Sequence, residues 1–280
     1  MVPEKITVGI SISLSGKFHL QGEQALQGVQ LWIAFVNQEG GIYVEEGTQS
    51  LPVELIAYDD RSKMGRAKDN VVRLLKEDRA DILLGPYSSV LTMAVASIAE
   101  REKKILWNHG GASDAICQQG WRYLVSVLSP ASCYLRSLPS YLTMKETSLR
   151  RLLCLTASSG TFADHVAQGL EATAEACGLT VVRVPFTSPV KDPREDIKVA
   201  LRQNPDLLVV IGSFEDDVKI VRHSIGMKPM VAVAAGVEAF GRALGVQAEG
   251  VMGPSQWEPG VHYSALTGPN SEWFSAHFKK

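Results

Sequence analysis

Residues 81–100, DILLGPYSSVLTMAVASIAE, combine residue types that suit anion binding. Residues 82–84 form a short apolar run without alternation, which is typical of a strand covered on both faces. Gly85-Pro86 ends the strand, and Ser88 and Ser89 precede a helical pattern. A serine at this place caps a helix, whose first turn offers free N–H groups and positive dipole potential to an anion. We therefore expect an anionic ligand group at this loop, at the carboxyl edge of a sheet.

Signatures of the common catalytic sites are absent from the sequence, which has no GxxxxGK[ST], GxGxxG, GxSxG or HExxH motif. The six histidines form no ligand pair at helical spacing, so we expect no metal site. His109 has the chemistry of a general base, but we interpret it as a polar loop residue. Asp59 and Asp60 would suit acid–base work or Mg²⁺, and turn formation explains them equally well. We expect no enzyme and no cofactor.

The composition excludes two further classes of function. The chain has 280 residues with 28 basic and 30 acidic side chains, and its basic pairs are isolated, which predicts no nucleic-acid partner. No apolar run reaches the length of a membrane span, and no signal-peptide pattern is present at residues 1–10. Four cysteines without CxxC spacing indicate free thiols, buried in the case of Cys154 and Cys177, although one disulfide stays open.

Strands and helices alternate along the chain with short connections, which predicts parallel sheets built from βαβ units. Two runs of five strands suggest two doubly wound α/β lobes. The first lobe is expected at residues 1–126 plus 255–280, and the second at 127–254, with hinge crossings near 126–130 and 253–257. The first run of expected strands is 6–12, 53–58, 82–84, 105–107 and 123–127, and the second is 152–156, 180–184, 207–211, 230–234 and 250–252.

Motifs in a specific order extend over nearly the whole chain. They are VGISISLSG at the first strand, LQGVQLWIAFVNQEGGI on the first helix, VELIAYDDRS, LLGPYSS, GLTVV, PDLLVVIGS and EGVMGPSQW. With these motifs the chain resembles the type I periplasmic binding proteins of ABC importers, in the leucine/isoleucine/valine-binding branch. The resemblance implies two Rossmann-like lobes with a hinge that close on a ligand. It also implies a longer chain, so that residues 271–280, which resemble a returning helix of the first lobe, mark a C-terminal truncation.

The resemblance assigns the carboxylate end of a ligand site to the first lobe. Ser89, beside Ser88, matches the family serine that binds an α-carboxylate. Gly110, Gly111 and Ala112 match the loop whose backbone holds the carboxylate and the amino group, and Ser113 lies just beyond. Gln21 falls where the family often has an aromatic residue near the mouth.

On the second lobe the resemblance assigns Phe162 and Phe214 to the positions of two binding tyrosines. A phenyl ring keeps the apolar wall and loses the hydroxyl, and ordinary core packing is the alternative interpretation of both residues. Ala235 stands where the family has the acidic residue that binds an ammonium group. Because a buried ammonium without a carboxylate partner is costly, we expect a small carboxylate with an apolar or aromatic body. An amino acid held by Glu215 or Glu238 stays open.

These expectations describe a monomeric substrate-binding component of an ABC importer. Its partners would be a small-molecule carboxylate, such as a branched-chain amino acid or an aromatic acid, and the ABC permease of the inner membrane. The implied location is periplasmic or extracellular. The alternative is a ligand-sensing receptor or regulator domain of the same fold.

Overall fold

The computed structural model describes residues 4–146, 148–224, 226, 230–258 and 267–278. The chain divides into two compact units. Unit 1 comprises residues 1–112, 116–128 and 257–280, and unit 2 comprises residues 113–115 and 129–256. The sequence placed residues 113–115 in the first lobe, whereas in the structure they pack within unit 2. Residues 259–266 and 279–280 of the expected first lobe lie outside the described residues.

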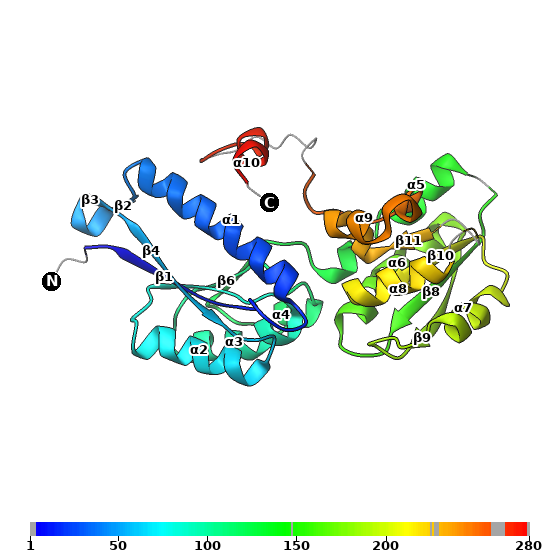
Figure 1. The fold of residues 1–280 in the computed structure, drawn as a ribbon, viewed down its shortest axis with the longest axis horizontal. Coiled ribbons are helices and arrows are strands. Elements are labelled where there is room, and N and C mark those ends of the chain that lie inside the picture. Colours follow the sequence, from blue (N-terminus) through cyan, green and yellow to red (C-terminus); the bar gives the residue numbers. More distant parts are fainter. Residues whose placement is uncertain (1–3, 147, 225, 227–229, 259–266, 279–280) are drawn as a thin grey trace. The chain divides into compact units, whose positions relative to one another are not determined.

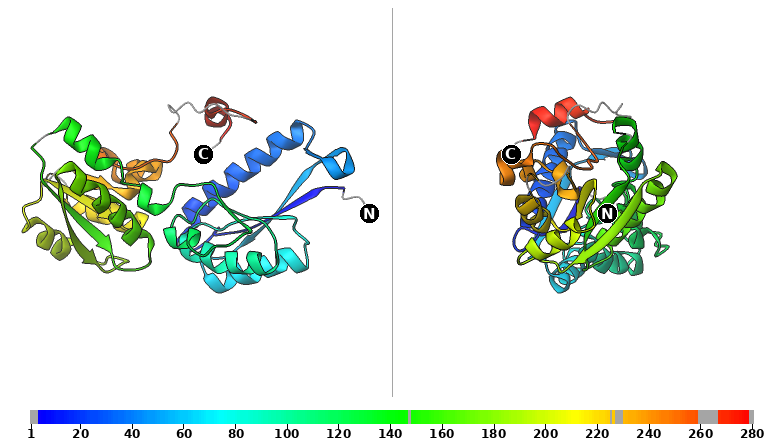
Figure 2. Two further views of the ribbon diagram at one scale, coloured as in Figure 1. Left: turned by 180° about the vertical axis from the view of Figure 1, so that it is seen from behind. Right: turned by 90° about the vertical axis from the view of Figure 1, so that its right-hand side faces the viewer.

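Unit 1 contains a parallel five-stranded sheet in the order β4-β1-β5-β6-β7. Helix α1 lies on one face and helices α2 and α3 lie on the other (Figure 1). The view from behind in Figure 2 shows the same two layers. The strands are β1 (Ile6–Ile12), β4 (Val53–Asp59), β5 (Ile82–Leu84), β6 (Leu106–Asn108) and β7 (Leu124–Ser126), and the helices are α1 (His19–Gln38), α2 (Met64–Lys76), α3 (Ser89–Arg101), α4 (Asp114–Cys117, shared with unit 2) and α10 (Ser271–His277).

The core of unit 1 lies between the sheet and the pair α2 and α3. It consists of fully or almost fully buried apolar residues, among them Val71, Leu74, Leu83, Val95 and Leu106. On β6 the side chains alternate, so that Leu106 is buried and Trp107 is 39% exposed on the opposite face. An antiparallel hairpin of β2 (Ile42–Val44) and β3 (Gln49–Leu51), joined by the 3₁₀ turn η1 (Glu45–Gly47), was not expected from the sequence.

Unit 2 repeats the topology of unit 1, with a parallel five-stranded sheet in the order β12-β11-β10-β8-β9. Right-handed crossovers place α6 on one face, where it packs on η2 and α5, and α7 and α8 together on the other face. The strands are β8 (Arg151–Ala157), β9 (Thr180–Phe186), β10 (Leu207–Ile211), β11 (Met230–Ala232) and β12 (Val251–Met252), the helices are α5 (Leu138–Lys145), α6 (Phe162–Ala174), α7 (Arg194–Leu201), α8 (Phe214–Ser224) and α9 (Glu238–Leu244), and the 3₁₀ turns are η2 (Ala131–Cys133), η3 (Glu175–Cys177), η4 (Val233–Gly236) and η5 (Gly245–Ala248).

The predicted fold class is confirmed: each unit is a doubly wound α/β domain. Strand β10 is buried at all five positions, which explains its continuous apolar sequence. All four cysteines are free; Cys154 is buried as expected, Cys177 is partly exposed, and Cys117 and Cys133 are exposed. Within the described part of the chain, no helix has the length and apolar character needed to cross a bilayer. The same residues contain no group of three or more His, Cys, Asp or Glu side chains arranged to hold a metal ion.

Candidate functional site

Each sheet has one point at which the strand order reverses direction, and ligands of doubly wound folds bind outside the carboxyl ends of the strands there. In unit 1 this point lies between β1 and β5, and in unit 2 it lies between β8 and β10. The loops that follow these strands carry most of the predicted site residues.

In unit 1 the structure brings together the two loops that were predicted to hold a carboxylate. The Ser88 N–H donates to the Gly110 carbonyl oxygen at 3.0 Å. Ser88 caps α3, because its Oγ accepts from the Leu91 N–H at 3.3 Å. Ser88 has φ 90°, an unusual value for a residue with a side chain, and Ser89 begins the helix. The start of α3 and the loop after β6 therefore form one surface of backbone and hydroxyl groups.

Asn108 holds the second of these loops in shape and was not predicted. Its side chain is fully buried. Its Oδ1 accepts from the Gly111 N–H at 2.8 Å, and its Nδ2 donates to the Gly111 carbonyl oxygen at 2.8 Å. Nδ2 also donates to Ser126 Oγ at 2.9 Å, which joins the ends of β6 and β7. A fully satisfied buried amide of this kind fixes a loop in one conformation.

Glycine is required at both positions of the loop, because backbone lies too close to Gly110 and the Thr92 side chain lies too close to Gly111. A Cβ on Gly110 would lie 2.7 Å from the Tyr87 Cα, and a Cβ on Gly111 would lie 2.6 Å from Thr92 Oγ1. Thr92 is itself fixed, since its Oγ1 donates to the Pro86 carbonyl oxygen at 3.2 Å. Ala112, the next residue, is almost fully buried.

Aromatic side chains lie at the loop that joins β5 to α3. The rings of Phe18 and Tyr87 contact each other with centroids 5.7 Å apart. Gln21, the residue predicted near the mouth, lies in the first turn of α1, and its Oε1 is buried without a protein partner among the described residues. His109 has a lowered pKa because burial disfavours its charged form. Its buried Nε2 contacts no proton donor or acceptor of the described residues, which fits the interpretation of His109 as a loop residue.

Ser113 lies in unit 2 with the two residues that follow it. It is 1% exposed, and its Oγ lies 2.7 Å from Thr161 Oγ1 and 3.2 Å from His165 Nδ1 in unit 2. Its role as a ligand contact stays a prediction, and the observed contacts are those of a buried side chain with partners inside the protein.

Asp59 and Asp60 organise the turns after β1 and β4. Asp59 accepts hydrogen bonds from Leu14 N–H and Ser15 Oγ at 2.9 and 2.7 Å. Asp60 is fully buried and accepts from Ser13 Oγ. Burial raises the pKa of the Asp60 carboxyl, against the effect of its hydrogen bonds. These contacts agree with the turn-forming interpretation of the pair.

In unit 2 the Asp216 carboxylate joins the loops that follow β9 and β10. It accepts from Val190 N–H at 2.7 Å, and from Ser188 Oγ and Ser213 Oγ at 2.5 and 2.8 Å. Burial by itself would raise the pKa of Asp216, but these hydrogen bonds outweigh it and hold the pKa below the ordinary value. Asp216 is therefore an ionised structural group.

Asp217, the next residue, joins the loop after β11. Its Oδ2 accepts from the Ala234 N–H at 2.9 Å, and its Oδ1 is buried without a partner among the described residues. Complete burial raises the pKa of Asp217 well above the ordinary value, because it disfavours the ionised form. The predicted residues Phe214 and Ala235 flank this network, one at the start of α8 and one in η4.

The remaining predicted residues of unit 2 have these surroundings. Phe162 begins α6 and packs edge-on against Tyr134, with centroids 5.4 Å apart. Phe214 and Ala235 are both partly exposed. Glu215 is exposed, and Glu238 accepts from the Arg242 guanidinium at 2.6 Å. The carboxylate of Glu238 thus already has a cationic partner.

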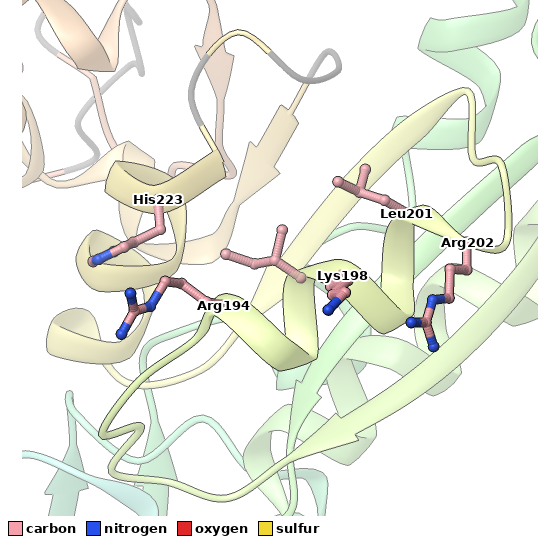
Figure 3. Close-up of a pocket in the computed structure, with 6 residues that line it drawn as sticks. Arg194, Lys198, Leu201, Arg202 and His223 are labelled. Atoms are coloured by element: carbon pink, nitrogen blue, oxygen red, sulfur yellow. The ribbon is translucent and has the colours of Figure 1, made fainter.

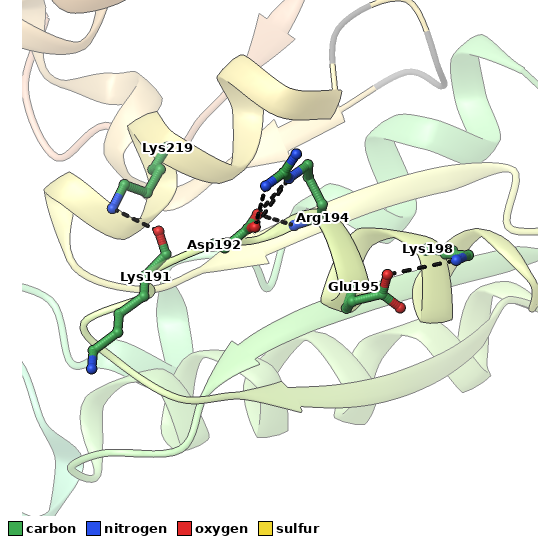
Figure 4. A network of polar contacts seen from close by, with 6 residues as sticks. All are labelled: Lys191, Asp192, Arg194, Glu195, Lys198 and Lys219. Atoms are coloured by element: carbon green, nitrogen blue, oxygen red, sulfur yellow. Dashed lines mark hydrogen bonds and ion pairs between the residues drawn. The ribbon is translucent and has the colours of Figure 1, made fainter.

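A cavity of about 430 Å³ lies elsewhere on unit 2, between α7 and α8 (Figure 3). Basic side chains surround it, but several of them already have partners (Figure 4). Arg194 pairs with Asp192, Lys198 lies 3.5 Å from Glu195, and His223 Nδ1 donates to the Lys219 carbonyl oxygen. The residues that line the cavity are Arg194, Ile197, Lys198, Leu201, Arg202 and His223. None of them is a predicted site residue. We assign it no role in ligand binding.

Comparisons with known proteins agree with the predicted recognition. A family model described as periplasmic binding protein matches residues 5–280. Leu/Ile/Val-binding protein homolog 8 of Brucella abortus (strain 2308) is 23% identical over 251 residues, covering 82% of this chain and 58% of that protein. This chain thus spans little more than half the length of that relative.

Solved structures show the same fold. The leucine-binding protein LivK of Thermotoga maritima MSB8 matches with a TM-score of 0.81 at 18% identity, covering 98% of this chain and 77% of that one. A solute-binding protein of an ABC transporter from R. palustris, in complex with 4-hydroxybenzoate, matches with a TM-score of 0.72 at 17% identity, covering 86% of this chain and 66% of that one. With its two doubly wound units and a family match over almost all of its length, the chain belongs to the periplasmic binding protein family.

Proposed function

We propose that this chain is the substrate-binding component of an ABC importer and that its ligand is a small carboxylate with an apolar or aromatic body. The observation that carries the proposal is the hydrogen bond between Ser88 and Gly110, which joins the start of α3 to the glycine loop after β6. Leucine and 4-hydroxybenzoate, for which these two structural relatives are named or with which they are in complex, both have a carboxylate on an apolar or aromatic body.

The unit 1 loops suit a carboxylate without using a basic side chain. The N–H groups in the first turn of α3 have no acceptor within the helix, because no turn precedes them. The helix dipole favours negative charge at the same place. The hydroxyl of Ser89 lies in that turn. Hydrogen bonds from neutral donors to an ionised carboxylate are stronger than bonds between neutral groups.

The unit 2 loops suit an apolar or aromatic body. Phe162 and Phe214 supply aromatic rings at the starts of α6 and α8. Ala235 supplies no carboxylate for an ammonium group, burial raises the pKa of Asp217 and disfavours its ionised form, and Glu238 is paired with Arg242. We therefore expect the ammonium group of an amino acid to add little to binding.

A matched pair of ligands tests this expectation. Leucine and 4-methylpentanoate share a side chain and a carboxylate, and only leucine has an ammonium group. Calorimetric titration of the full chain should give dissociation constants within about tenfold of each other, a difference of about 1.4 kcal/mol. Tight binding of leucine with no response to 4-methylpentanoate or 4-hydroxybenzoate would refute the ligand class.

Substitution of one serine tests the carboxylate site. Ser89→Ala should weaken binding of the carboxylate about tenfold to a hundredfold, because it removes a hydrogen bond to a charged group. Ser97→Ala is the matched control on the same helix, since Ser97 Oγ donates only within α3, to the Ala94 carbonyl oxygen at 3.1 Å. Equal effects of the two substitutions would remove Ser89 from the site.

The proposed partner is the ABC permease of the inner membrane, and the proposed location is the periplasm or the outer cell surface. Stimulation of ATP hydrolysis by a reconstituted transporter in the presence of ligand and this chain would support the importer. Saturable binding of a ligand without stimulation of ATP hydrolysis would favour a sensing receptor of the same fold.

A further inference from the structure

Three consecutive residues belong to unit 2, although the residues on both sides of them belong to unit 1. Residues up to 112 and from 116 to 128 belong to unit 1, whereas Ser113–Ala115 belongs to unit 2. This segment directly follows the glycine loop Gly110–Ala112. It adds crossings at 112–113 and 115–116 to those at 128–129 and 256–257.

Ser113 is anchored at the start of α6. The residue is 1% exposed, and its hydroxyl oxygen lies 2.7 Å from Thr161 Oγ1 and 3.2 Å from His165 Nδ1. Thr161 is the residue that precedes α6, and His165 lies in the first turn of that helix.

Asp114 anchors the same segment at a second place. Its Oδ2 accepts from the Ser132 N–H at 3.0 Å, and its Oδ1 accepts from Ser132 Oγ. Ser132 lies in η2, on which α6 packs so closely that a Cβ on Gly169 would lie 1.8 Å from the Ser132 carbonyl oxygen. The segment, η2 and α6 thus form one packed and hydrogen-bonded cluster.

The composition of this cluster resembles a Ser-His-Asp triad, but its geometry excludes that role. In a triad one histidine nitrogen contacts the serine and the other contacts the aspartate. Here the same atom, His165 Nδ1, lies near both Ser113 Oγ at 3.2 Å and Asp114 Oδ2 at 3.7 Å. The Asp114 carboxylate is already occupied by Ser132. The cluster holds a segment in place and does not activate a nucleophile.

We propose that Thr161 and His165 are positioning residues, which hold Ser113 in unit 2 and thereby fix the end of the glycine loop that binds the ligand carboxylate. Ala112 is bonded to Ser113, and consecutive Cα atoms are about 3.8 Å apart, so an anchored Ser113 restricts the positions that Ala112 can take. The effect of this anchor on ligand affinity rests on the proposed function. Its effect on the position of the loop does not depend on what the protein binds.

Hydrogen–deuterium exchange on the full chain without ligand tests the positioning. In Thr161→Ala, exchange of the Gly110 and Gly111 amides should become about fivefold to tenfold faster, the effect of losing about 1 to 1.4 kcal/mol of local stability. Thr161→Ser keeps the hydroxyl and should restore slow exchange. Thr173→Ala is the matched control, because Thr173 Oγ1 on α6 donates only to the Gly169 and Leu170 carbonyl oxygens.

Faster exchange in α6 and η2 with unchanged exchange at Gly110 and Gly111 would overturn the proposal, because it would show stabilisation of unit 2 alone. Equal acceleration by Thr173→Ala would also overturn it. If Thr161→Ala also accelerates exchange in β10, unit 2 as a whole has lost stability. The double variant Thr161→Ala with Ser113→Ala then tests whether the two residues act on the loop together. Effects on the loop that are less than additive support a direct coupling, and additive effects contradict it.

A second readout is ligand affinity. Thr161→Ala should weaken binding about threefold to tenfold, with recovery in Thr161→Ser, for whichever of leucine, 4-methylpentanoate and 4-hydroxybenzoate binds most tightly. If none of these three carboxylates binds, the proposed function is refuted. The exchange result would still decide whether Thr161 positions the loop. Faster loop exchange with unchanged affinity would refute the link between the anchor and the ligand.

Discussion

Gly169 lies where α6 packs on η2, and replacing it by alanine is a stringent test of this packing. The new Cβ would lie 1.8 Å from the Ser132 carbonyl oxygen and 2.6 Å from the Ser132 carbonyl carbon. A carbon–oxygen contact needs roughly 3.3 Å. The two elements must therefore separate by roughly 1.5 Å, and neither contact is the end of a flexible side chain.

The expected loss is the difference of two effects. Overpacking a dense interior costs about 1–3 kcal/mol, and a clash with backbone belongs at the upper end of that range. Replacing glycine by alanine within a helix gains about 1 kcal/mol. The free energy of unfolding of unit 2 should therefore fall by about 2 kcal/mol.

Gly241→Ala is the matched control. Gly241 lies in α9 of the same unit, and a Cβ there would meet nothing within 4 Å. This substitution should raise the free energy of unfolding by about 0.5–1 kcal/mol through helix propensity alone.

Urea unfolding followed by far-UV circular dichroism measures both variants. The midpoint should shift with an unchanged m value if only stability changes. All five tryptophans lie in segments of unit 1, so tryptophan fluorescence reports on the other unit and gives an internal reference. A Gly169→Ala protein as stable as the Gly241→Ala protein would refute the close approach of α6 and η2.

Further predictions concern Asp216, Asp217 and the cysteines. The pKa of Asp217 is raised by burial above the ordinary value of 3.8, so the folded chain holds this proton to higher pH than the unfolded chain, and the residue lowers stability as pH rises above 3.8. Asp217→Asn should leave unit 2 at least as stable at pH 7 and flatten the pH dependence of its unfolding midpoint between pH 4 and 7. Asp216→Asn should cost about 1.5–3 kcal/mol at pH 7, because it removes the charge that its hydrogen bonds stabilise, and the loss should diminish below pH 4; equal midpoints for the two variants would contradict these assignments. Burial raises the pKa of Cys154 to about 12, so iodoacetamide should modify the exposed Cys117 and Cys133 in the native protein and Cys154 only after unfolding, as mass spectrometry would show.

The alternation of apolar strands with amphipathic helices predicted the doubly wound fold, because burial on both faces leaves a continuous apolar pattern such as residues 207–211. The β2–β3 hairpin escaped prediction because each strand has only three residues. Its turn includes Gly47, but the residue with positive φ is Thr48 at 50°, and threonine does not signal that conformation.

Local sequence placed Ser88, Ser89 and the glycine loop correctly at strand ends, since parallel strands end at the same edge of a sheet. It missed Asn108 because the partners of a buried amide are set by tertiary structure. It also placed Ser113 with its sequence neighbours, whereas a hydroxyl pair with Thr161 and a contact with His165 hold Ser113 in unit 2. Side chains that bridge loops are the part of a site that spacing alone does not reveal.

The most direct test of the account is a calorimetric titration of acids against the corresponding alcohols. Leucine and 4-hydroxybenzoate would be compared with leucinol and 4-hydroxybenzyl alcohol, which keep the apolar or aromatic body and lack the carboxylate. The account predicts saturable binding with one ligand per chain for at least one of the two acids, and binding at least a hundredfold weaker for its alcohol. An alcohol that binds as tightly as its acid, or a chain that binds neither acid, would contradict the proposed carboxylate site.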